Sequence, residues 1–202
     1  TEADGRVTHN RGSSSGGNKY YANPPDCDID PFVRTIAFFN GDQPILAIHS
    51  YATHPMSYYG RGGVTWDFVG IARERLRREQ KGIEHIYLSG CSGDVTAGKY
   101  NDGSPDNRQV LADRLYIGLK QSFESIERQP LQKLEYRSIP FHLQYNQKPE
   151  YKRDHLTNQL KDKDLDIIKR IAAAMSLSSL DRVERNHPID MACIDFGHGK
   201  VV

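Results

Sequence analysis

Two apolar runs near the start of the chain predict neighbouring β-strands. They cover residues 33–39 and 43–51 and are separated by Asn40-Gly41-Asp42. An Asn-Gly pair between apolar runs is a strong sequence signal for a β-hairpin with a tight turn. We therefore predict an antiparallel pair of strands over these residues.

A helical pattern follows, and then a third apolar run. From Asp67 on, apolar residues recur every three or four positions, which predicts a helix that ends near Gly82. The apolar positions are Phe68, Ile71, Ala72 and Leu76, and the polar side carries Arg73, Arg75, Arg77 and Arg78. We expect these arginines to form a solvated face rather than a binding patch. Residues 83–88 are predicted as a buried strand.

The next segment carries the clearest helix signal of the chain. Ser104 and Pro105 suit the N-cap and the first helical position, and apolar residues follow at helical spacing. Those residues are Leu111, Leu115, Leu119, Phe123 and Ile126. The pattern predicts a helix that runs to about Glu127.

The last third of the chain alternates strand and helix signals. Residues 131–144 predict one or two strands broken at Pro140, and residues 146–154 predict a loop. A helical stripe follows, made of Leu156, Leu160, Leu165, Ile168, Ala172 and Met175. Residues 189–196 predict a strand that turns at Gly197-His198-Gly199. Residues 200–202 are expected to begin another strand.

This order of elements predicts an α/β fold with a mixed β-sheet and flanking helices. A length of 202 residues fits one domain over residues 1–202. Within it, residues 1–31 are predicted to be largely loop, because they lack apolar periodicity. Since no pattern opens the chain and its last strand breaks off, we expect a domain that is truncated at both ends.

Composition and charge exclude some classes of partner. The chain has 27 Lys and Arg against 26 Asp and Glu, a net charge of +1, and its cations are scattered. This balance does not favour nucleic-acid binding. No apolar window approaches the ~18 residues of a membrane span, and no signal peptide is visible. The three cysteines, Cys27, Cys91 and Cys193, lack metal-ligand spacing, and an odd number argues against a disulfide framework. The sequence determines neither the redox compartment nor the oligomeric state.

Polar, glycine-containing segments follow two of the predicted strands, and we expect one composite active site there. His54 lies in the first of these loops, where a neutral imidazole suits zinc, whereas His49 lies inside the strand and is by default a core or edge histidine. After the second strand, Ser92 follows Gly90 as in the elbow of serine hydrolases, but Asp94 stands where that motif has glycine. Cys91 is expected to be a small buried residue, with a thiol pair to His54 as the alternative.

Short motifs also occur in a particular order along the chain. They are Asn10-Arg11, Tyr21-Ala22-Asn23-Pro24, Asp28-Ile29-Asp30-Pro31, His54-Pro55-Met56-Ser57, Val64-Thr65-Trp66-Asp67-Phe68-Val69-Gly70 and Gly93-Asp94-Val95-Thr96. In this order they resemble the N-terminal catalytic domain of the neutral/alkaline, non-lysosomal ceramidases. That family has Asn-Arg-Ser, Tyr-x-x-Asn-Pro, an Asp-rich stretch, a histidine loop, Ile-Ser-x-Asp-x-x-Gly and Gly-Asp-Val-Ser-Pro in these places.

The resemblance implies a zinc-dependent amidase that hydrolyses the N-acyl bond of ceramide to sphingosine and a fatty acid. By position, His54 matches a zinc-ligand histidine, and Thr96 matches the serine beside the scissile amide. Arg11 matches an arginine that helps hold the substrate. The resemblance also implies a lipid-like N-acyl amide as partner and a secreted or periplasmic location.

Three further residues are expected to contact substrate or to support the site, namely Asn10, Asp67 and Asp94. The two aspartates are expected to orient loops rather than touch substrate. The chain departs from the family pattern at Thr96 in place of serine, at Ala97 in place of proline, and in the loop after His54. The family's other zinc ligands find no match, so the remaining ligands of a Zn²⁺ ion are expected outside this chain.

Two other functions stay open. One is a serine hydrolase that uses Ser92 as nucleophile with His54 or His49 as base. The other is a ceramidase-like module that binds without catalysis. Metal content separates the zinc-dependent amidase from both alternatives, and reaction with a fluorophosphonate probe identifies the serine hydrolase.

Overall fold

The computed structural model describes residues 29–57, 63–93, 95–97 and 100–202. The chain forms two compact units, residues 1–128 and 129–202. Helices and strands are present in both units, which confirms the predicted α/β class. The prediction of one domain over the whole chain stays a prediction, and the loop predicted for residues 1–31 falls mostly outside the described residues.

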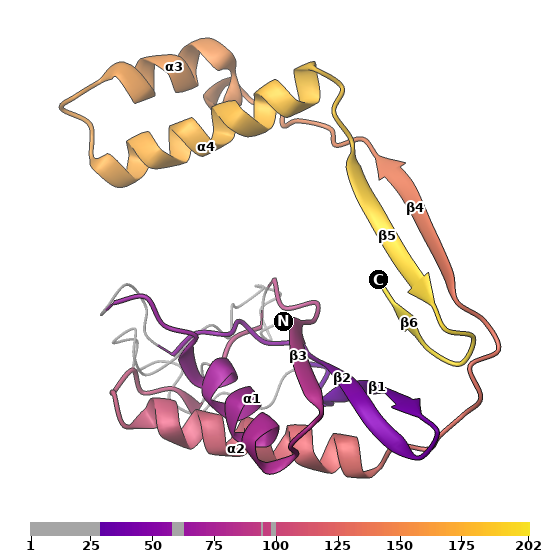
Figure 1. Ribbon diagram of the computed structural model, residues 1–202. Helices are drawn as coiled ribbons and strands as arrows, with labels where there is room; N and C mark the ends of the chain where they lie inside the picture. Colours follow the sequence, from indigo (N-terminus) through magenta and orange to yellow (C-terminus); the bar gives the residue numbers. More distant parts are fainter. Residues whose placement is uncertain (1–28, 58–62, 94, 98–99) are drawn as a thin grey trace, which may run out of the picture. The chain divides into compact units, whose positions relative to one another are not determined.

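The sheet of the first unit is mixed, with strand order β1-β2-β3 (Figure 1). β1 (Arg34–Asn40) and β2 (Gln43–Tyr51) form the predicted antiparallel hairpin, and Gly41 has a φ of +59° in its turn. The chain then crosses over through α1 (Asp67–Glu79), and β3 (Glu84–Ser89) pairs parallel with β2. The C-terminal ends of β2 and β3 therefore lie at the same edge of the sheet.

Two helices supply the core of this unit. α2 (Asn107–Glu124) packs against α1, and their buried side chains form one apolar cluster. The cluster consists of Phe68, Val69, Ala72, Leu76, Leu111, Ala112, Leu115, Tyr116 and Leu119. Tyr51 and Tyr87 of the strands pack against it, so the helices cover one face of the sheet. Each fully buried leucine contributes roughly 1.5–3 kcal/mol relative to an exposed one.

The predicted helix ends differ from the observed ones by up to three residues. α1 begins at Asp67 as predicted and ends at Glu79, and Gly82 (φ +89°) lies in the turn that follows. α2 begins at Asn107, because residues 104–106 form a turn in which the Pro105 carbonyl accepts the Arg108 N–H. The Ser104 hydroxyl still accepts the Asn107 N–H, at 3.3 Å.

The arginine side of α1 is solvated, as predicted. Arg77 and Arg78 pair with Glu74 on the same helix, and Arg75 pairs with Asp113, all through exposed guanidinium groups. Such exposed pairs contribute little to stability. These three arginines therefore lie on a solvated surface, and each is paired with a carboxylate.

β3 is not the buried strand that its apolar run predicts. His85 is 3% exposed, whereas Ile86 and Leu88 are 43% and 39% exposed. Because successive side chains of a strand point to opposite faces, His85 lies on the helix-covered face and the other two on the open face. Apolar content alone did not indicate that Ile86 and Leu88 stay partly exposed on the face opposite to the helices, as the described residues show.

A chain of hydrogen bonds crosses the helix-covered face of the sheet. The Ser122 hydroxyl donates to the Val33 carbonyl (3.1 Å) and lies 2.8 Å from the Thr35 hydroxyl. Thr35 Oγ1 is in turn 2.8 Å from His49 Nδ1. His49 Nε2 lies 3.0 Å from His85 Nδ1, and the two rings stack with centroids 5.3 Å apart.

The Val33 carbonyl sets the direction of this chain, because a carbonyl can only accept. The single hydroxyl proton of Ser122 goes to Val33, so Thr35 donates to Ser122. His49 Nδ1–H then donates to Thr35, and His85 Nδ1–H donates to His49 Nε2. Because burial lowers the pKa of both histidines, both imidazoles are neutral near pH 7, and each then carries its proton on Nδ1.

The second unit contains an antiparallel sheet with strand order β4-β5-β6. Its strands are β4 (Glu135–Phe141), β5 (Ile189–Asp195) and β6 (Lys200–Val201). The predicted break at Pro140 is wrong, since Pro140 lies inside β4 opposite Asp190. β4 is an edge strand, where a residue without an N–H is tolerated. The predicted turn after β5 is confirmed, with Gly197 at φ +89°.

The predicted helical stripe of this unit is divided between two helices. They are α3 (Arg153–Lys161) and α4 (Ile167–Glu184), and a 3₁₀ turn (Pro149–Tyr151) precedes them. Asp166 accepts the Ile168 N–H (2.9 Å) and caps α4. Arg153 pairs with Asp181 and Glu184, which ties the two helices together.

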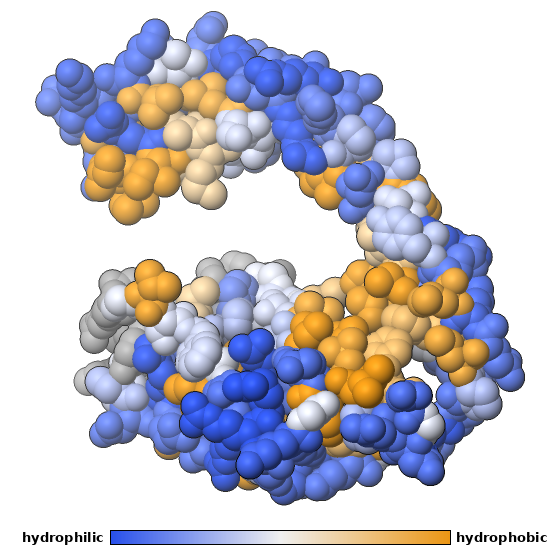
Figure 2. Space-filling model, viewed as in Figure 1, coloured by the Kyte–Doolittle hydropathy of each residue, from blue (hydrophilic) through white to orange (hydrophobic). Residues whose placement is uncertain are grey.

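The break between the helices shifts the helical phase, so the predicted stripe gives the buried Leu156 of α3 correctly but not the buried face of α4. Ile168 and Met175 are each 67% exposed, whereas Leu156, Ala173 and Leu180 are buried. Figure 2 shows the resulting apolar surface over α3 and α4. None of the helices in the described ranges combines the length and apolarity needed to cross a bilayer.

The buried histidine pair predicts a loss of stability in mild acid. Burial, together with the neighbouring His85, lowers the pKa of His49 to about 4, and burial lowers the pKa of His85. Unfolded histidines bind protons below pH ~6.5 while the folded pair does not, so acid favours the unfolded state. For His49 alone, the free energy of unfolding should fall by about 2 kcal/mol between pH 7.5 and pH 5.

Urea unfolding at intervals from pH 7.5 to pH 5.5 measures this slope at least about one pH unit above the ordinary pKa values of carboxylates. The variant His85→Phe keeps the ring contacts with His49 and Phe123 but removes one titrating group. Its slope should be shallower than that of the wild type. Equal slopes in the two proteins would contradict the assignment to this pair.

Candidate active site

The loops that follow β2 and β3 meet at the edge of the sheet where both strands end. Gly90 N–H donates to the Tyr51 carbonyl at 2.9 Å. A Cβ on Gly90 would lie 3.2 Å from the Ala52 backbone nitrogen, so the two loops approach each other as closely as a glycine allows. A tight turn from strand to loop therefore explains the glycine at this position without a catalytic role.

His54 is bound twice by one carbonyl of the opposite loop. Its backbone N–H donates to the Val95 carbonyl at 2.8 Å, and its Nδ1 lies 3.0 Å from the same oxygen. Because a carbonyl accepts and never donates, Nδ1 carries the proton and Nε2 keeps a lone pair. A backbone carbonyl on the far nitrogen is how proteins orient histidines that bind metals.

Thr96 follows Val95 directly, so His54 and Thr96 belong to loops that are bonded to each other. His49 is different, although it precedes His54 by only five residues. It is 0% exposed, and both ring nitrogens bond to neighbours on the helix-covered face. His49 is the satisfied core histidine of the default prediction, and neither nitrogen is available to serve as a base for Ser92.

Asp67 holds the loop that carries His54. Its carboxylate accepts the Ser57 N–H (2.8 Å), the Ser57 hydroxyl (2.5 Å) and the Phe68 N–H (2.6 Å), and the residue is 7% exposed. Burial alone would raise the pKa of Asp67, but the hydrogen bonds from Ser57 and Phe68 and the charge of Arg108 lower it. The ionised carboxylate orients the loop, and its bonds are all directed to the protein's own groups.

The backbone of Asp67 also has an uncommon conformation. Its φ is +52°, in the left-handed region that side chains other than glycine rarely adopt. Aspartate and asparagine tolerate this region best. The residue that bonds to Ser57 is thus also one of the few that can begin α1 with this geometry.

Three partners in this network were not identified from the sequence. The sequence patterns indicate Ser57 only as part of the loop after the second strand, and they predict no role for Asn101 or Arg108. The Arg108 Nε donates to the Ser57 hydroxyl oxygen (3.3 Å) and lies 3.5 Å from Asp67, and the Asn101 amide donates to the Ser57 carbonyl (3.0 Å). No local pattern joins positions 44 residues apart, so only the fold could reveal them.

The other predicted residues of the site cannot be placed. Asn10, Arg11 and Asp94 lie outside the described residues. In the described ranges, no group of three or more His, Cys, Asp or Glu side chains is arranged to hold a metal ion. Of the zinc ligands implied by the family resemblance, the structure describes His54 alone.

Cys91 and Ser92 form part of the second loop. Cys91 is exposed, so the expectation of a small buried residue is wrong, because the chain has already left the sheet at Ser89. The Ser92 carbonyl accepts the Val95 N–H at 3.1 Å in a tight turn. Within the described part of the chain, no hydrogen bond joins the Ser92 hydroxyl to a histidine.

Replacement of the buried carboxylate gives a test of the loop network. Asp67→Asn preserves the shape of the side chain and tolerates the backbone conformation. It removes the negative charge, and it replaces one of the two oxygens that accept the three hydrogen bonds. We expect a loss of about 1–3 kcal/mol in the free energy of unfolding, typical of buried donors left without a partner. The Ser57 amide should also exchange its hydrogen faster.

The exposed ion pair on α2 provides the control for this experiment. Asp113→Asn breaks its bond to Arg75, and the change should be within about 0.5 kcal/mol because exposed pairs are weak. Urea unfolding and amide hydrogen exchange measure both variants. Equal losses in the free energy of unfolding for the two substitutions would contradict a stabilising role of the Asp67 hydrogen bonds.

Comparison with known proteins adds no relative to this geometry. The chain matched none of the protein-family models, none of the curated proteins and none of the solved structures with which it was compared.

Proposed function

We propose that this chain is part of the catalytic domain of a zinc-dependent amidohydrolase similar to neutral ceramidase. Its substrate would be a lipid-like N-acyl amide, with ceramide hydrolysed to sphingosine and a fatty acid. One observation carries the proposal: the Val95 carbonyl binds the Nδ1–H of His54 directly beside Thr96. The family resemblance supplies the reaction, and this bond supplies a histidine whose remaining nitrogen can act as a ligand.

The donor chemistry of His54 fits zinc. A neutral imidazole nitrogen is among the preferred ligands of Zn²⁺, and catalytic zinc sites usually have three protein ligands and one open position. Nε2 of His54 would be one ligand, and we propose that the others come from outside the described residues. When bound, zinc would polarise the amide carbonyl and lower the pKa of a bound water.

The chain's own groups would then do the positioning. The Thr96 hydroxyl, on the residue after Val95, would donate to the oxygen that gains charge during attack on the amide. Arg11 would hold the substrate, and the buried Asp67 would keep the His54 loop in place. Donors fixed before the reaction stabilise the transition state more than donors that must reorganise. A secreted or periplasmic location belongs to the same proposal.

The test is the removal of the proposed ligand. In the product of the complete gene, His54→Ala should lose stoichiometric zinc after dialysis. Its kcat/KM for an N-acyl sphingosine should fall by at least about 100-fold, beyond the 10–100-fold typical for loss of an outer partner of a metal ligand. Plasma mass spectrometry and an assay of fatty-acid release measure the two effects.

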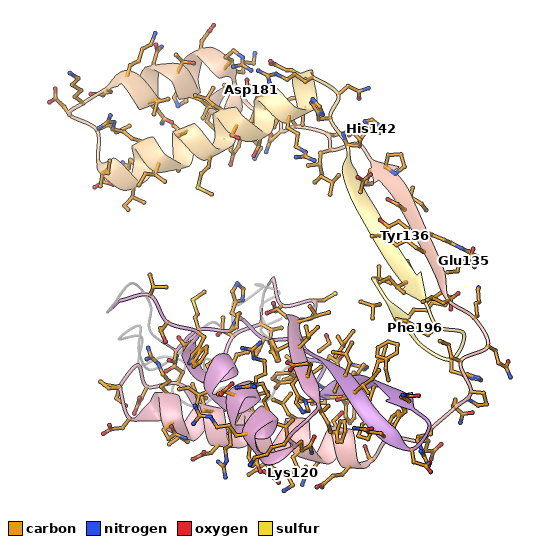
Figure 3. All side chains as sticks on the ribbon, viewed as in Figure 1. Lys120, Glu135, Tyr136, His142, Asp181 and Phe196 are labelled. Carbon is orange, nitrogen blue, oxygen red and sulfur yellow. The ribbon has the colours of Figure 1, made fainter. Side chains whose placement is uncertain are left out.

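The control replaces a histidine that has no part in the site. His142 follows β4 and is exposed (Figure 3). His142→Ala should keep both zinc and activity. Undiminished zinc and activity in His54→Ala, with the fold intact, would overturn the proposal. A protein that binds zinc but cleaves no amide would instead support the non-catalytic module.

A serine hydrolase is the second candidate, because Ser92 lies in the tight turn that contains Val95. The elbow motif nevertheless fails at Asp94, and the Nδ1–H of His54 is held by a backbone carbonyl rather than by the carboxylate that orients the base of a catalytic triad. We therefore expect Ser92→Ala to leave amidase activity within a few-fold of the wild type. Complete loss of activity with the fold intact, together with labelling of the wild type by a fluorophosphonate, would favour the serine hydrolase.

A further inference from the structure

The two loops of the candidate site are tied together at two places. The first tie is the Val95 carbonyl, which binds both donors of His54. The second joins the amide of Asn101 to the carbonyl of Ser57 at 3.0 Å. His54 and Ser57 lie on the loop after β2, and Val95 and Asn101 lie on the segment after β3, so Thr96 stands between the two ties.

Asn101 uses both halves of its amide, and it is fully buried. Its Nδ2 donates to the Ser57 carbonyl, while its Oδ1 accepts the Gly103 N–H at 2.9 Å. The latter bond closes a local turn in which Gly103 has a φ of +75°. A carboxylate of the same shape could accept from Gly103 but could not donate to Ser57, and an aliphatic side chain could do neither.

Ser57 is held from two sides as a result. Asp67 accepts its N–H and its hydroxyl, and Asn101 donates to its carbonyl. All the polar groups of this residue are bonded, and the residue is 0% exposed. The described part of the loop after β2 is therefore held at Ser57, three residues from His54.

We propose that Asn101 is a positioning residue that sets the distance between His54 and Thr96. The catalytic role in this inference rests on the proposed function, whereas the hydrogen bond between Asn101 and Ser57 does not depend on it. Without the second tie, the Val95 contact and the Gly90 bond to the Tyr51 carbonyl would remain, but the Ser57 carbonyl would lose its bond to the segment that carries Thr96. With both ties, the imidazole and the hydroxyl have one arrangement before substrate binds, which is where the largest gains from orientation arise.

Substitution by aspartate separates the two roles of this amide. N101D keeps the acceptor for Gly103 and loses the donor to Ser57. We expect kcat to fall about 10- to 100-fold with little change in KM, the size of effect that a displacement of a reacting group by about 1 Å can produce. In the metal-free protein, the ¹⁵N shifts of the His54 ring should move from a pure Nδ1–H tautomer toward a mixture of tautomers.

A pH profile distinguishes positioning from general damage. When the introduced carboxyl is protonated it regains an O–H that can donate to the Ser57 carbonyl. The ratio of N101D to wild-type activity should therefore rise as pH falls. A variant that is merely less stable would show no such recovery.

Ser122→Ala is the control, because it removes a part-buried side-chain hydrogen bond elsewhere in the first unit. It should lower stability while leaving kcat and the His54 shifts unchanged. Wild-type shifts and kcat in N101D, or equal changes in Ser122→Ala, would overturn the inference. If the wild type shows no amidase activity but N101D still changes the His54 shifts, the tie is real and the proposed function fails.

Discussion

The parallel pairing of β2 with β3 is the constraint on which the first unit depends. Parallel neighbours cannot be joined by a tight turn, so the chain must leave the sheet and return, and α1 makes this crossover. The crossover lays α1 beside α2 and creates the apolar cluster between them. It also brings two strand ends to one edge, so the loops that begin there are bonded to each other and can share a site.

Two histidines, one in β2 and one in the loop that follows it, differ in how they are buried and bonded. His49 lies on the covered face, where water is excluded, and both its nitrogens must find partners within the protein. His54 lies beyond the end of the strand, and one carbonyl fixes one of its nitrogens. The residue type is the same, but the first imidazole completes a hydrogen-bond chain, whereas the second is held through Nδ1, and we propose its Nε2 as a zinc ligand.

The loops around the candidate site owe their order to polar contacts rather than to apolar packing. Ser57, Asp67 and Asn101 are buried polar residues, and each bonds to another of the three. A half-satisfied network of this kind would destabilise the fold, whereas a satisfied one gives an irregular segment a single conformation. The proposed chemistry depends on this property, since a ligand and a hydroxyl on separate loops are useful only at a fixed spacing.

The sequence by itself determined the elements that depend on near neighbours. The Asn40-Gly41 turn set the first hairpin, and helical periodicity marked the start of α1 at Asp67, because turn chemistry and spacing act within a few residues. Only the tertiary structure decided which faces are buried and which polar groups meet. Periodicity shows which residues share a side but not whether anything covers it, so the exposure of Ile86 was not foreseen. Bonds between residues 36 or 44 positions apart, such as His49 to His85 and Ser57 to Asn101, leave no trace in local sequence.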